Sequence, residues 1–290
     1  MSEWRQAPIG TEPPLQAPGT QTMNADPVDL AQCHGIFVRQ KTQVQDTGYL
    51  LFGVPYVAQN RYRMFRLPSN VPNPSWVPTA EEVAGYDEIM FIDEESDLLD
   101  RAAWAFLGGA QLRPLILHVG STQTGKELFQ AHRPFQIGGH CCCPWEMDIL
   151  SPDNSVIIGR VVQNFDPYCD KCCQQCWTMT NYTDVIPSVA GQEPQAKFTL
   201  KRSSCCCGRV NNCCGATCCN PKEVIDILDD RGKLIGVIER HYAAGDKACF
   251  RMCFGFINFS LRFPPQTSRE ERMLLLSAMM LQEYTLTPTA

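Results

Sequence analysis

Ile257-Asn-Phe-Ser-Leu-Arg-Phe263 alternates strictly between apolar and polar side chains and stops at Pro264-Pro265. In an extended chain, successive side chains point to opposite faces. The four apolar residues of this stretch therefore share one face, and Asn258, Ser260 and Arg262 share the other. This pattern predicts a strand that is buried on one side.

A buried helix is predicted directly after the two prolines. Ser268-Arg-Glu-Glu271 fits a capping box, in which a hydroxyl and a carboxylate each satisfy a free amide of the first turn. The following run, 273–281, is apolar except for Ser277. Nine residues make about 13 Å of helix, whereas a bilayer core of about 30 Å needs about 20 residues. The run is therefore expected to be buried within the protein; its apolar members for that role are Met273, Leu274, Leu275, Leu276, Met279, Met280 and Leu281.

Composition indicates an ordinary folded protein that does not bind nucleic acid. The chain has 290 residues, 44% of them hydrophobic, and a formal net charge of -6. Nucleic-acid binding depends on concentrated Lys and Arg, and the sequence has no long basic run. No signal peptide and no run of 18 apolar residues is apparent, so we expect a protein that faces the cytosol. There the 17 cysteines are expected to be reduced, as thiols for lipid or metal.

The chain divides into a leader and one domain. Residues 1–30 are rich in proline, glycine, glutamine and threonine, and they predict a disordered leader. Residues 31–287 are expected to form a single β-rich domain with the buried helix at its end.

Many short strands are predicted along this domain. Asp229-Asp-Arg-Gly232 between two of them indicates a hairpin. About a dozen such strands favour an antiparallel barrel or sandwich, and a closed barrel of this size has room for a helix inside. The predicted strands are 36–43, 49–57, 61–67, 88–93, 114–119, 127–136, 145–150, 156–164, 177–182, 197–201, 223–228, 233–239 and 257–263.

Several stretches resemble the phospholipid scramblase family. The main one runs from Arg133-Pro-Phe-Gln-Ile-Gly-Gly-His through Cys141-Cys-Cys-Pro-Trp145 to Ser151-Pro152. Others follow the family's order: 93–97 with 113–118, 157–161, 232–236, and Asn258-Phe259 with Phe263-Pro264. The resemblance covers about residues 30–285.

The resemblance implies a fold and an activity. The fold is tubby-like, an all-β protein in which a closed antiparallel barrel of twelve strands encloses a hydrophobic C-terminal helix. The implied activity is bidirectional movement of membrane phospholipids between leaflets, stimulated by calcium and independent of ATP. The implied location is the cytoplasmic face of a membrane, most naturally the plasma membrane. The chain has no Walker-type phosphate loop and no GxSxG or HExxH motif, so no chemical catalysis is expected.

Calcium is implied only by the resemblance. The family's calcium locus lies near Asn258, Ser268, Glu270 and Glu271. Aligned on Phe263-Pro264, its carboxylate positions fall on residues 255, 257, 266 and 268, none of which is acidic here. Since calcium takes six to eight oxygens, several of them ionised, the residues themselves do not favour calcium dependence.

The cysteine clusters suggest a lipid anchor, a metal site or plain packing. Cys141, Cys142 and Cys143 match the stretch that the family uses for S-palmitoylation, and two or three acyl chains make a durable anchor. A structural zinc site is the other chemistry that such spacings allow, because CxxC lets one turn supply two thiolates. The zinc candidates are Cys169, Cys172, Cys173, Cys176, Cys213, Cys214, Cys218 and Cys219. A second function therefore stays open: a cysteine-rich membrane adaptor, acylated or zinc-bound, that has lost scrambling.

Overall fold

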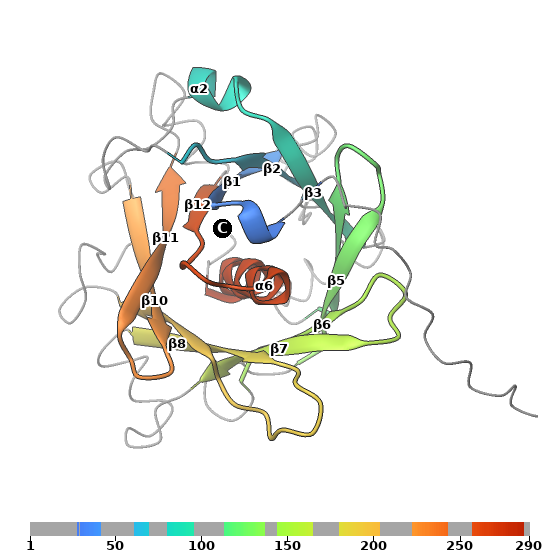
Figure 1. Cartoon of the computed structure of the whole chain (residues 1–290), viewed down its shortest axis with the longest axis vertical. Helices are drawn as coiled ribbons and strands as arrows, with labels where there is room; N and C mark the ends of the chain where they lie inside the picture. Colours follow the sequence, from blue (N-terminus) through green and yellow to red (C-terminus); the bar gives the residue numbers. More distant parts are fainter. Residues whose placement is uncertain are drawn as a thin grey trace, which may run out of the picture.

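Twelve antiparallel strands form a closed barrel in the part of the chain that the computed structural model describes (Figure 1). That part comprises residues 28, 30–41, 61–69, 80–95, 113–136, 144–164, 180–203, 222–242 and 257–286. The strands are β1 (Gly35–Lys41), β2 (Arg61–Arg66), β3 (Glu88–Glu95), β4 (Leu115–Ser121), β5 (Glu127–Arg133), β6 (Glu146–Leu150), β7 (Ile157–Asn164), β8 (Thr180–Pro187), β9 (Phe198–Ser203), β10 (Lys222–Asp229), β11 (Leu234–Tyr242) and β12 (Ile257–Arg262). The described helices are η1 (Leu30–Gln32), α2 (Ala80–Ala84) and α6 (Arg269–Leu286).

The barrel is a meander closed by its first and last strands. Each strand pairs with its neighbours in the sequence, and β1 pairs with β12 in the register Gly35↔Arg262 and Ile36↔Leu261. Full closure leaves no unpaired strand edge. Of the two folds that the strand pattern allows, the structure is therefore the barrel. The predicted strand 49–57 lies outside the described residues.

β5 and β8 differ from the prediction, the first for a local reason and the second because of burial. β5 ends at Arg133 and not at residue 136, because Pro134 has no amide hydrogen to donate to the ladder. β8 runs over Thr180–Pro187, later than the predicted 177–182. Thr183 and Val185 are both buried, so the inward face continues past the predicted end.

The hairpin at Asp229–Gly232 forms as predicted. Gly232 adopts a positive φ of 74°, which glycine reaches without a side-chain clash. One carboxylate oxygen of Asp229 accepts hydrogen bonds from the amides of Arg231, at 3.0 Å, and Lys233, at 2.8 Å. The turn thereby fixes the register between β10 and β11.

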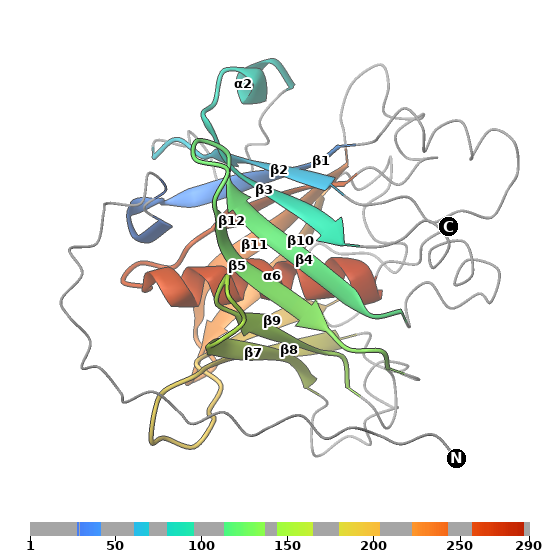
Figure 2. The ribbon, with the colours of Figure 1, turned by 90° about the vertical axis from the view of Figure 1, so that its right-hand side faces the viewer.

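The inner faces of the strands and α6 share one hydrophobic core. All seven apolar side chains predicted for burial are at most 4% exposed. The helix contacts β6, β7, β8 and η1. Seen down the barrel, α6 lies within the outline of the strands, and the side view shows it running along the barrel (Figures 1 and 2).

The helix packs closely against β7 at Gly159. A Cβ atom added at Gly159 would lie 2.6 Å from the carbonyl oxygen of Ile186 and 2.8 Å from Cδ2 of Leu274. These distances are shorter than normal carbon contacts, so only glycine allows this approach. Gly159 thus belongs to the fit between barrel and helix.

Arg272 ties the beginning of the helix to the segment before β1. Its guanidinium donates to the carbonyl oxygens of Cys33, at 2.9 Å, and Leu30, and its Nε donates to Thr267 Oγ1 at 2.8 Å. Val28 and Leu30 are each 1% exposed. Val28 and Leu30, the last part of the predicted leader, are thus buried against the domain, and residues 1–27 of that leader lie outside the described residues.

No helix among the described residues is long and apolar enough to cross a membrane.

Replacing Leu274 with Ala is expected to destabilise the fold by about 2–5 kcal/mol, because Leu274 is fully buried in α6 and its loss leaves a cavity. Leu234→Ala is the matched control. Because Leu234 is 37% exposed, this substitution should lower the free energy of unfolding by well under about 1 kcal/mol. Urea unfolding followed by circular dichroism measures both. Equal losses for the two variants would contradict the burial of α6.

Candidate functional site

The four residues implied for calcium do not form one locus in the structure. Asn258 lies near the beginning of β12, whereas Ser268, Glu270 and Glu271 come after its far end. Because an extended strand advances about 3.3 Å per residue, the passage from Asn258 to Phe263 spans about 16 Å. The structure thus brings Ser268, Glu270 and Glu271 together and leaves Asn258 apart.

These three residues form the start of α6. The amide of Glu271 donates to Ser268 Oγ at 3.2 Å, and the amide of Ser268 donates to Glu271 Oε2 at 2.9 Å, which is the predicted capping box. The Ser268 hydroxyl also donates to Glu270 Oε2 at 2.9 Å. The second oxygen of Glu271 pairs with Lys197. Both acids therefore already have partners that belong to helix capping.

All predicted cysteine sites lie outside the described residues. This holds for the acylation candidates Cys141, Cys142 and Cys143 and for the eight zinc candidates between residues 169 and 219. Within the described part of the chain, no group of three or more His, Cys, Asp or Glu side chains could hold a metal ion. Acylation and zinc binding remain predictions.

The strands nevertheless relate these clusters to one end of the barrel. In the sequence, every cysteine except Cys33 falls between β5 and β6, β7 and β8, β9 and β10, or β11 and β12. Since neighbouring strands are antiparallel, the four segments start and finish at the same barrel end. We call it the cysteine-side end; α6 also finishes there.

Buried charged side chains gather at the cysteine-side end. They come from the ends of strands, from Arg113 just before β4, and from the last turns of α6. Most are at most 10% exposed, and Arg202 is 13% exposed. The set is Glu94, Arg113, Arg133, Arg202, Glu223, Arg240 and Glu283.

One group of these charges joins β3, the start of β4 and α6. Arg113 Nη1 lies 2.5 Å from Glu94 Oε1, and the Tyr284 hydroxyl donates to Glu94 Oε2 at 3.3 Å. Burial, followed by the nearby Tyr62 hydroxyl and Glu94, raises the pKa of Tyr284 well above its ordinary value. Tyr284 therefore stays protonated and acts as a donor to Glu94.

A second group joins β9, β10, β11 and α6. Glu223 accepts hydrogen bonds from Arg202 and, at 3.1 Å, from Arg240, whose other terminal nitrogen lies 3.4 Å from Glu283. Burial alone would raise the pKa of Glu223, but the two guanidinium groups outweigh it and lower the pKa. The carboxyl end of α6 carries the partial negative charge of the helix dipole, which also favours cations at this position.

Arg133 and Trp145 adjoin the first group. Arg133 Nη2 donates to the Arg113 carbonyl oxygen at 2.9 Å, and its guanidinium carbon lies 5.3 Å from the centre of the Trp145 ring. Each side chain is 2% exposed. Burial, and secondly the positive charge of Arg113, lower the pKa of Arg133 to about 10. Arg133 is still charged at neutral pH.

Sequence reasoning missed this charged cluster, although a signal for it exists. Each of these strand residues continues the inward alternation of its strand, as Glu94 does after Met90 and Ile92, and Arg133 after Phe129 and Ala131. A charged residue at an inward position of a strand end predicts a buried ion pair at the mouth of a barrel. Glu94, Arg113 and Arg133, which lie far apart in the sequence, meet in this cluster.

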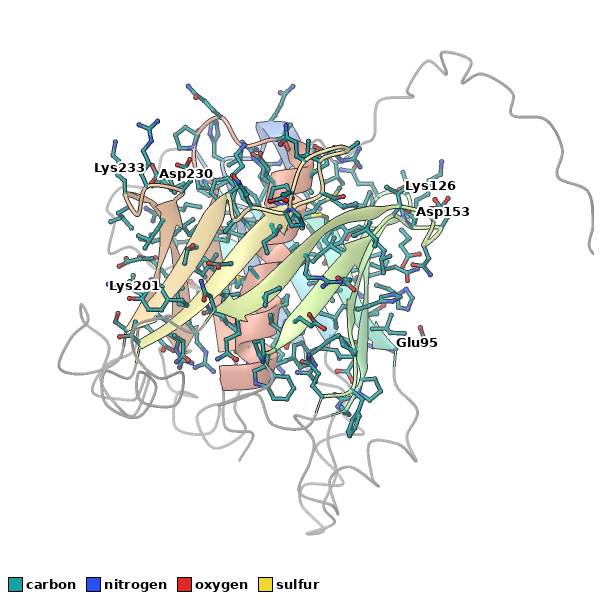
Figure 3. All side chains as sticks on the ribbon, turned by 90° about the horizontal axis from the view of Figure 1, so that it is seen from below. Glu95, Lys126, Asp153, Lys201, Asp230 and Lys233 are labelled. Carbon is teal, nitrogen blue, oxygen red and sulfur yellow. The ribbon has the colours of Figure 1, made fainter. Side chains whose placement is uncertain are left out.

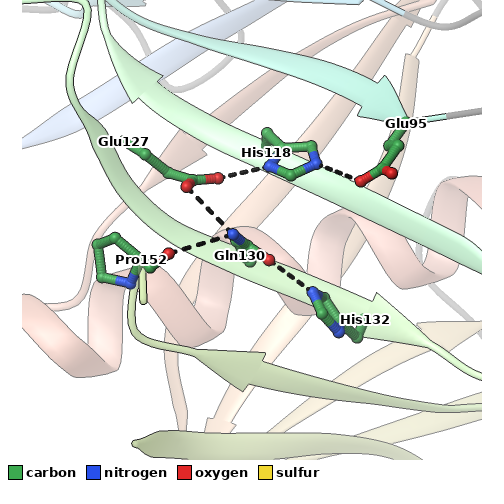
Figure 4. A network of polar contacts seen from close by, with 6 residues as sticks. All are labelled: Glu95, His118, Glu127, Gln130, His132 and Pro152. Atoms are coloured by element: carbon green, nitrogen blue, oxygen red, sulfur yellow. Dashed lines mark hydrogen bonds and ion pairs between the residues drawn. The ribbon is translucent and has the colours of Figure 1, made fainter. Parts of the chain in front are cut away.

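A separate polar network lies on the outer face of β3, β4 and β5 (Figure 4). His118 Nδ1 lies 2.5 Å from Glu127 Oε1, and its Nε2 lies 2.8 Å from Glu95 Oε2. Gln130 donates to Glu127 Oε2 at 3.1 Å and accepts from His132 at 2.7 Å. Because both ring nitrogens of His118 face carboxylates, the arrangement suits the protonated ring, which donates from both.

The pKa of His118 responds to these neighbours. Partial burial alone would lower it, but the hydrogen bonds and negative charges of Glu95 and Glu127 raise the pKa above its ordinary value. The pKa of His132 is lowered by burial and then by the charge of His118. The hydrogen bonds of this network connect β3, β4 and β5, and their strength depends on the protonation of His118.

Charged side chains also project from other parts of the described outer surface (Figure 3). Lys126, Asp153, Asp230 and Lys233 stand at the hairpins of the end opposite the cysteine-side end, and Lys201 points out from the side of the barrel. An open hollow of about 440 Å³ at that opposite end is lined by Gln32, His34, Arg66, Leu67, Pro68, Ser69, Gly85, Tyr86 and Asp87.

Comparisons with models of protein families, with curated proteins and with solved structures find no match for this chain.

Replacing His118 with Gln is expected to cost stability in a pH-dependent way. Since the folded-state pKa of His118 is raised, the protonated ring contributes fully below the unfolded-state value of about 6.5, and the contribution is lost as pH rises through the folded-state pKa. The difference between wild type and variant in urea unfolding should therefore be largest below about pH 6.5 and should shrink as the pH rises above that value.

His132→Gln is the matched control on the next strand. Because the pKa of His132 is lowered, the wild type should lose stability relative to this variant as pH falls below about 6.5. The same sign of pH dependence in both variants would disprove the role assigned to the His118 network.

Proposed function

We propose that this chain is a membrane-associated phospholipid scramblase-like protein, which moves phospholipids in both directions between leaflets without ATP. The observation that carries the proposal is the architecture. A closed barrel of twelve antiparallel strands followed by a buried C-terminal helix is what the scramblase resemblance implies. About a dozen strands and a buried apolar helix also follow from the residue pattern alone, so two lines of reasoning agree.

In this proposal α6 is enclosed by the barrel, as in the tubby-like fold. Every side chain from Glu271 to Gln282 is buried, although this stretch covers all sides of a helix. The contacts to β6, β7, β8 and η1, the close approach at Gly159, and the ion pairs of Glu283 all hold the helix in the barrel. An enclosed helix makes the barrel a rigid platform that meets the membrane from one side.

Attachment to the membrane is assigned to the cysteine-side end. Cys141, Cys142 and Cys143 lie in the sequence between β5 and β6, and acylation there would set this end against the bilayer. Zinc held by the other cysteine clusters would brace the same end. The cytoplasmic face of the plasma membrane is the location that fits reduced, acylated thiols.

The outer surface favours a place among the lipid headgroups and water over one in hydrocarbon. Charged pairs run across neighbouring strands, as at Arg63–Glu88, 3.2 Å apart, and Arg160–Asp148, 2.6 Å apart. Such charges are costly where no water can solvate them. Lipid movement would then occur at the membrane surface beside the barrel.

The second candidate is a membrane adaptor, acylated or zinc-bound, that lacks scrambling. It is favoured by the geometry of the implied calcium locus, since Glu270 and Glu271 are engaged in capping and Asn258 lies apart. This geometry argues against stimulation by calcium, but it does not argue against lipid movement in the absence of calcium.

Purified full-length protein in liposomes with a fluorescent phospholipid tests the two candidates. We expect loss of leaflet asymmetry without ATP, at similar rates with calcium and with a chelator. Protein-free liposomes are the control. Unchanged asymmetry under both conditions, together with zinc in elemental analysis, would rule out the scramblase and support the adaptor.

Changing Cys141, Cys142 and Cys143 together to Ser is expected to move most of the protein from the membrane to the soluble fraction of cells, because each lost acyl chain removes about 0.8 kcal/mol per buried methylene. The matched control changes the other run of three consecutive cysteines, Cys205, Cys206 and Cys207, to Ser. Full retention of the first variant on membranes would exclude this triplet as the anchor.

A further inference from the structure

We propose that Arg133 and Trp145 form a binding site for a phosphate group, supplied by a lipid headgroup or by free phosphate. The lipid source rests on the proposed function, whereas the site itself rests on the geometry. Arg133 ends β5 and Trp145 directly precedes β6, so both residues lie at the cysteine-side end of the barrel.

The first argument is a set of buried donors that lack acceptors. Arg133 Nε, Arg133 Nη1 and Trp145 Nε1 are among the buried polar atoms of the described residues that have no hydrogen-bond partner. A buried donor without a partner costs free energy, and native proteins rarely keep one. Here three such nitrogen atoms belong to two side chains in contact, 5.3 Å from guanidinium carbon to ring centre. All three are donors, so the missing partner must accept.

The second argument is charge. Arg113 and Arg133 bring two positive charges together, and the nearby carboxylate of Glu94 is paired with Arg113 at 2.5 Å and also accepts from Tyr284. No ion pair joins Arg133 to a carboxylate within the described ranges. Two guanidinium groups thus share one carboxylate, and one positive charge is left over. A buried charge that is not balanced is expensive, and a water molecule would not neutralise it. The missing acceptor is therefore an anion.

Phosphate fits this donor set best. It is rich in acceptor oxygens, it carries negative charge as a monoester, a diester or the free ion, and the planar guanidinium fork of arginine matches its geometry. The indole nitrogen supplies a further donor. In the sequence, the proposed acyl anchor at 141–143 lies between Arg133 and Trp145, so acylation would hold the site next to lipid headgroups.

Binding is tested on the full-length protein by calorimetric titration with inorganic phosphate and, separately, with a water-soluble short-chain phosphatidylcholine. We expect Arg133→Met to weaken binding by about tenfold or more, because it removes charged hydrogen bonds. Trp145→Phe, which keeps the aromatic ring, should weaken it less. Arg160→Met is the matched control, since Arg160 lies on the outer face and pairs with Asp148, and it should bind like the wild type.

The two titrations distinguish the sources. Binding of the phosphatidylcholine that is lost in Arg133→Met assigns the site to lipid headgroups, and binding of inorganic phosphate alone assigns it to the free ion. Wild-type protein that binds neither probe, or an Arg133→Met variant that binds as the wild type does, overturns the proposal.

Thermal unfolding tests whether Arg133→Met loses binding only because it fails to fold. Without phosphate, Arg133→Met should leave the melting midpoint unchanged or raise it, because the variant removes a buried charge that lacks a counter-ion. Added phosphate should raise the midpoint of the wild type only. A lower midpoint of the phosphate-free variant would show that the chain itself supplies the acceptor, against the proposal. Phosphate binding by a protein that fails in the liposome assay would refute the proposed function and leave this site standing.

Discussion

The burial of α6 is the constraint on which the rest of the structure depends. A closed barrel of twelve strands has an interior wider than its own side chains usually fill, so it needs further apolar volume to form a dense core. The run from Met273 to Leu281 is buried in the same hydrophobic core as the inner faces of the strands. Gly159 leaves room for Leu274, and Arg272 joins the helix start to the carbonyl groups of Leu30 and Cys33, next to the strand that closes the barrel.

The two ends of the helix are held by different chemistry. At its start, Ser268 and Glu271 satisfy each other's amides, and Lys197 neutralises the glutamate. At its end, Tyr284 and Glu283 enter two buried ionic groups built on Glu94 and Glu223. Because buried charges are tolerated only with partners, these groups also fix how far the helix extends along the barrel. Arg133 is the member of this cluster whose charge is left over.

Much of the fold could be predicted from the sequence, because alternation and capping are local signals. The strand 257–263, the hairpin at Asp229–Gly232 and the capping box at Ser268 follow from residues close together in the chain, and all three form. Ends that depend on tertiary contacts were less accurate: β8 continues while its inward face stays buried, and Val28 joins the core ahead of the predicted boundary.

The candidate site was harder to predict, since its residues come from distant strands. Arg113 and Arg133 were noticed only as parts of family-like stretches, and their meeting with Glu94 and Tyr284 depends on the register of β3, β4 and β5. The cysteine clusters are clear in the sequence, but spacing alone does not choose between acyl chains and zinc. The inward position of a charge at a strand end is the signal that would have located the buried cluster.

Hydrogen exchange of the α6 amides, followed by mass spectrometry on the native full-length protein, tests the central claim most directly. If the helix is packed in the barrel, the amides of residues 273–281 exchange as slowly as those of β7 and β8, because they open only with the whole fold. Exchange of this segment at the rate of exposed amides, while the strands stay protected, would contradict the account.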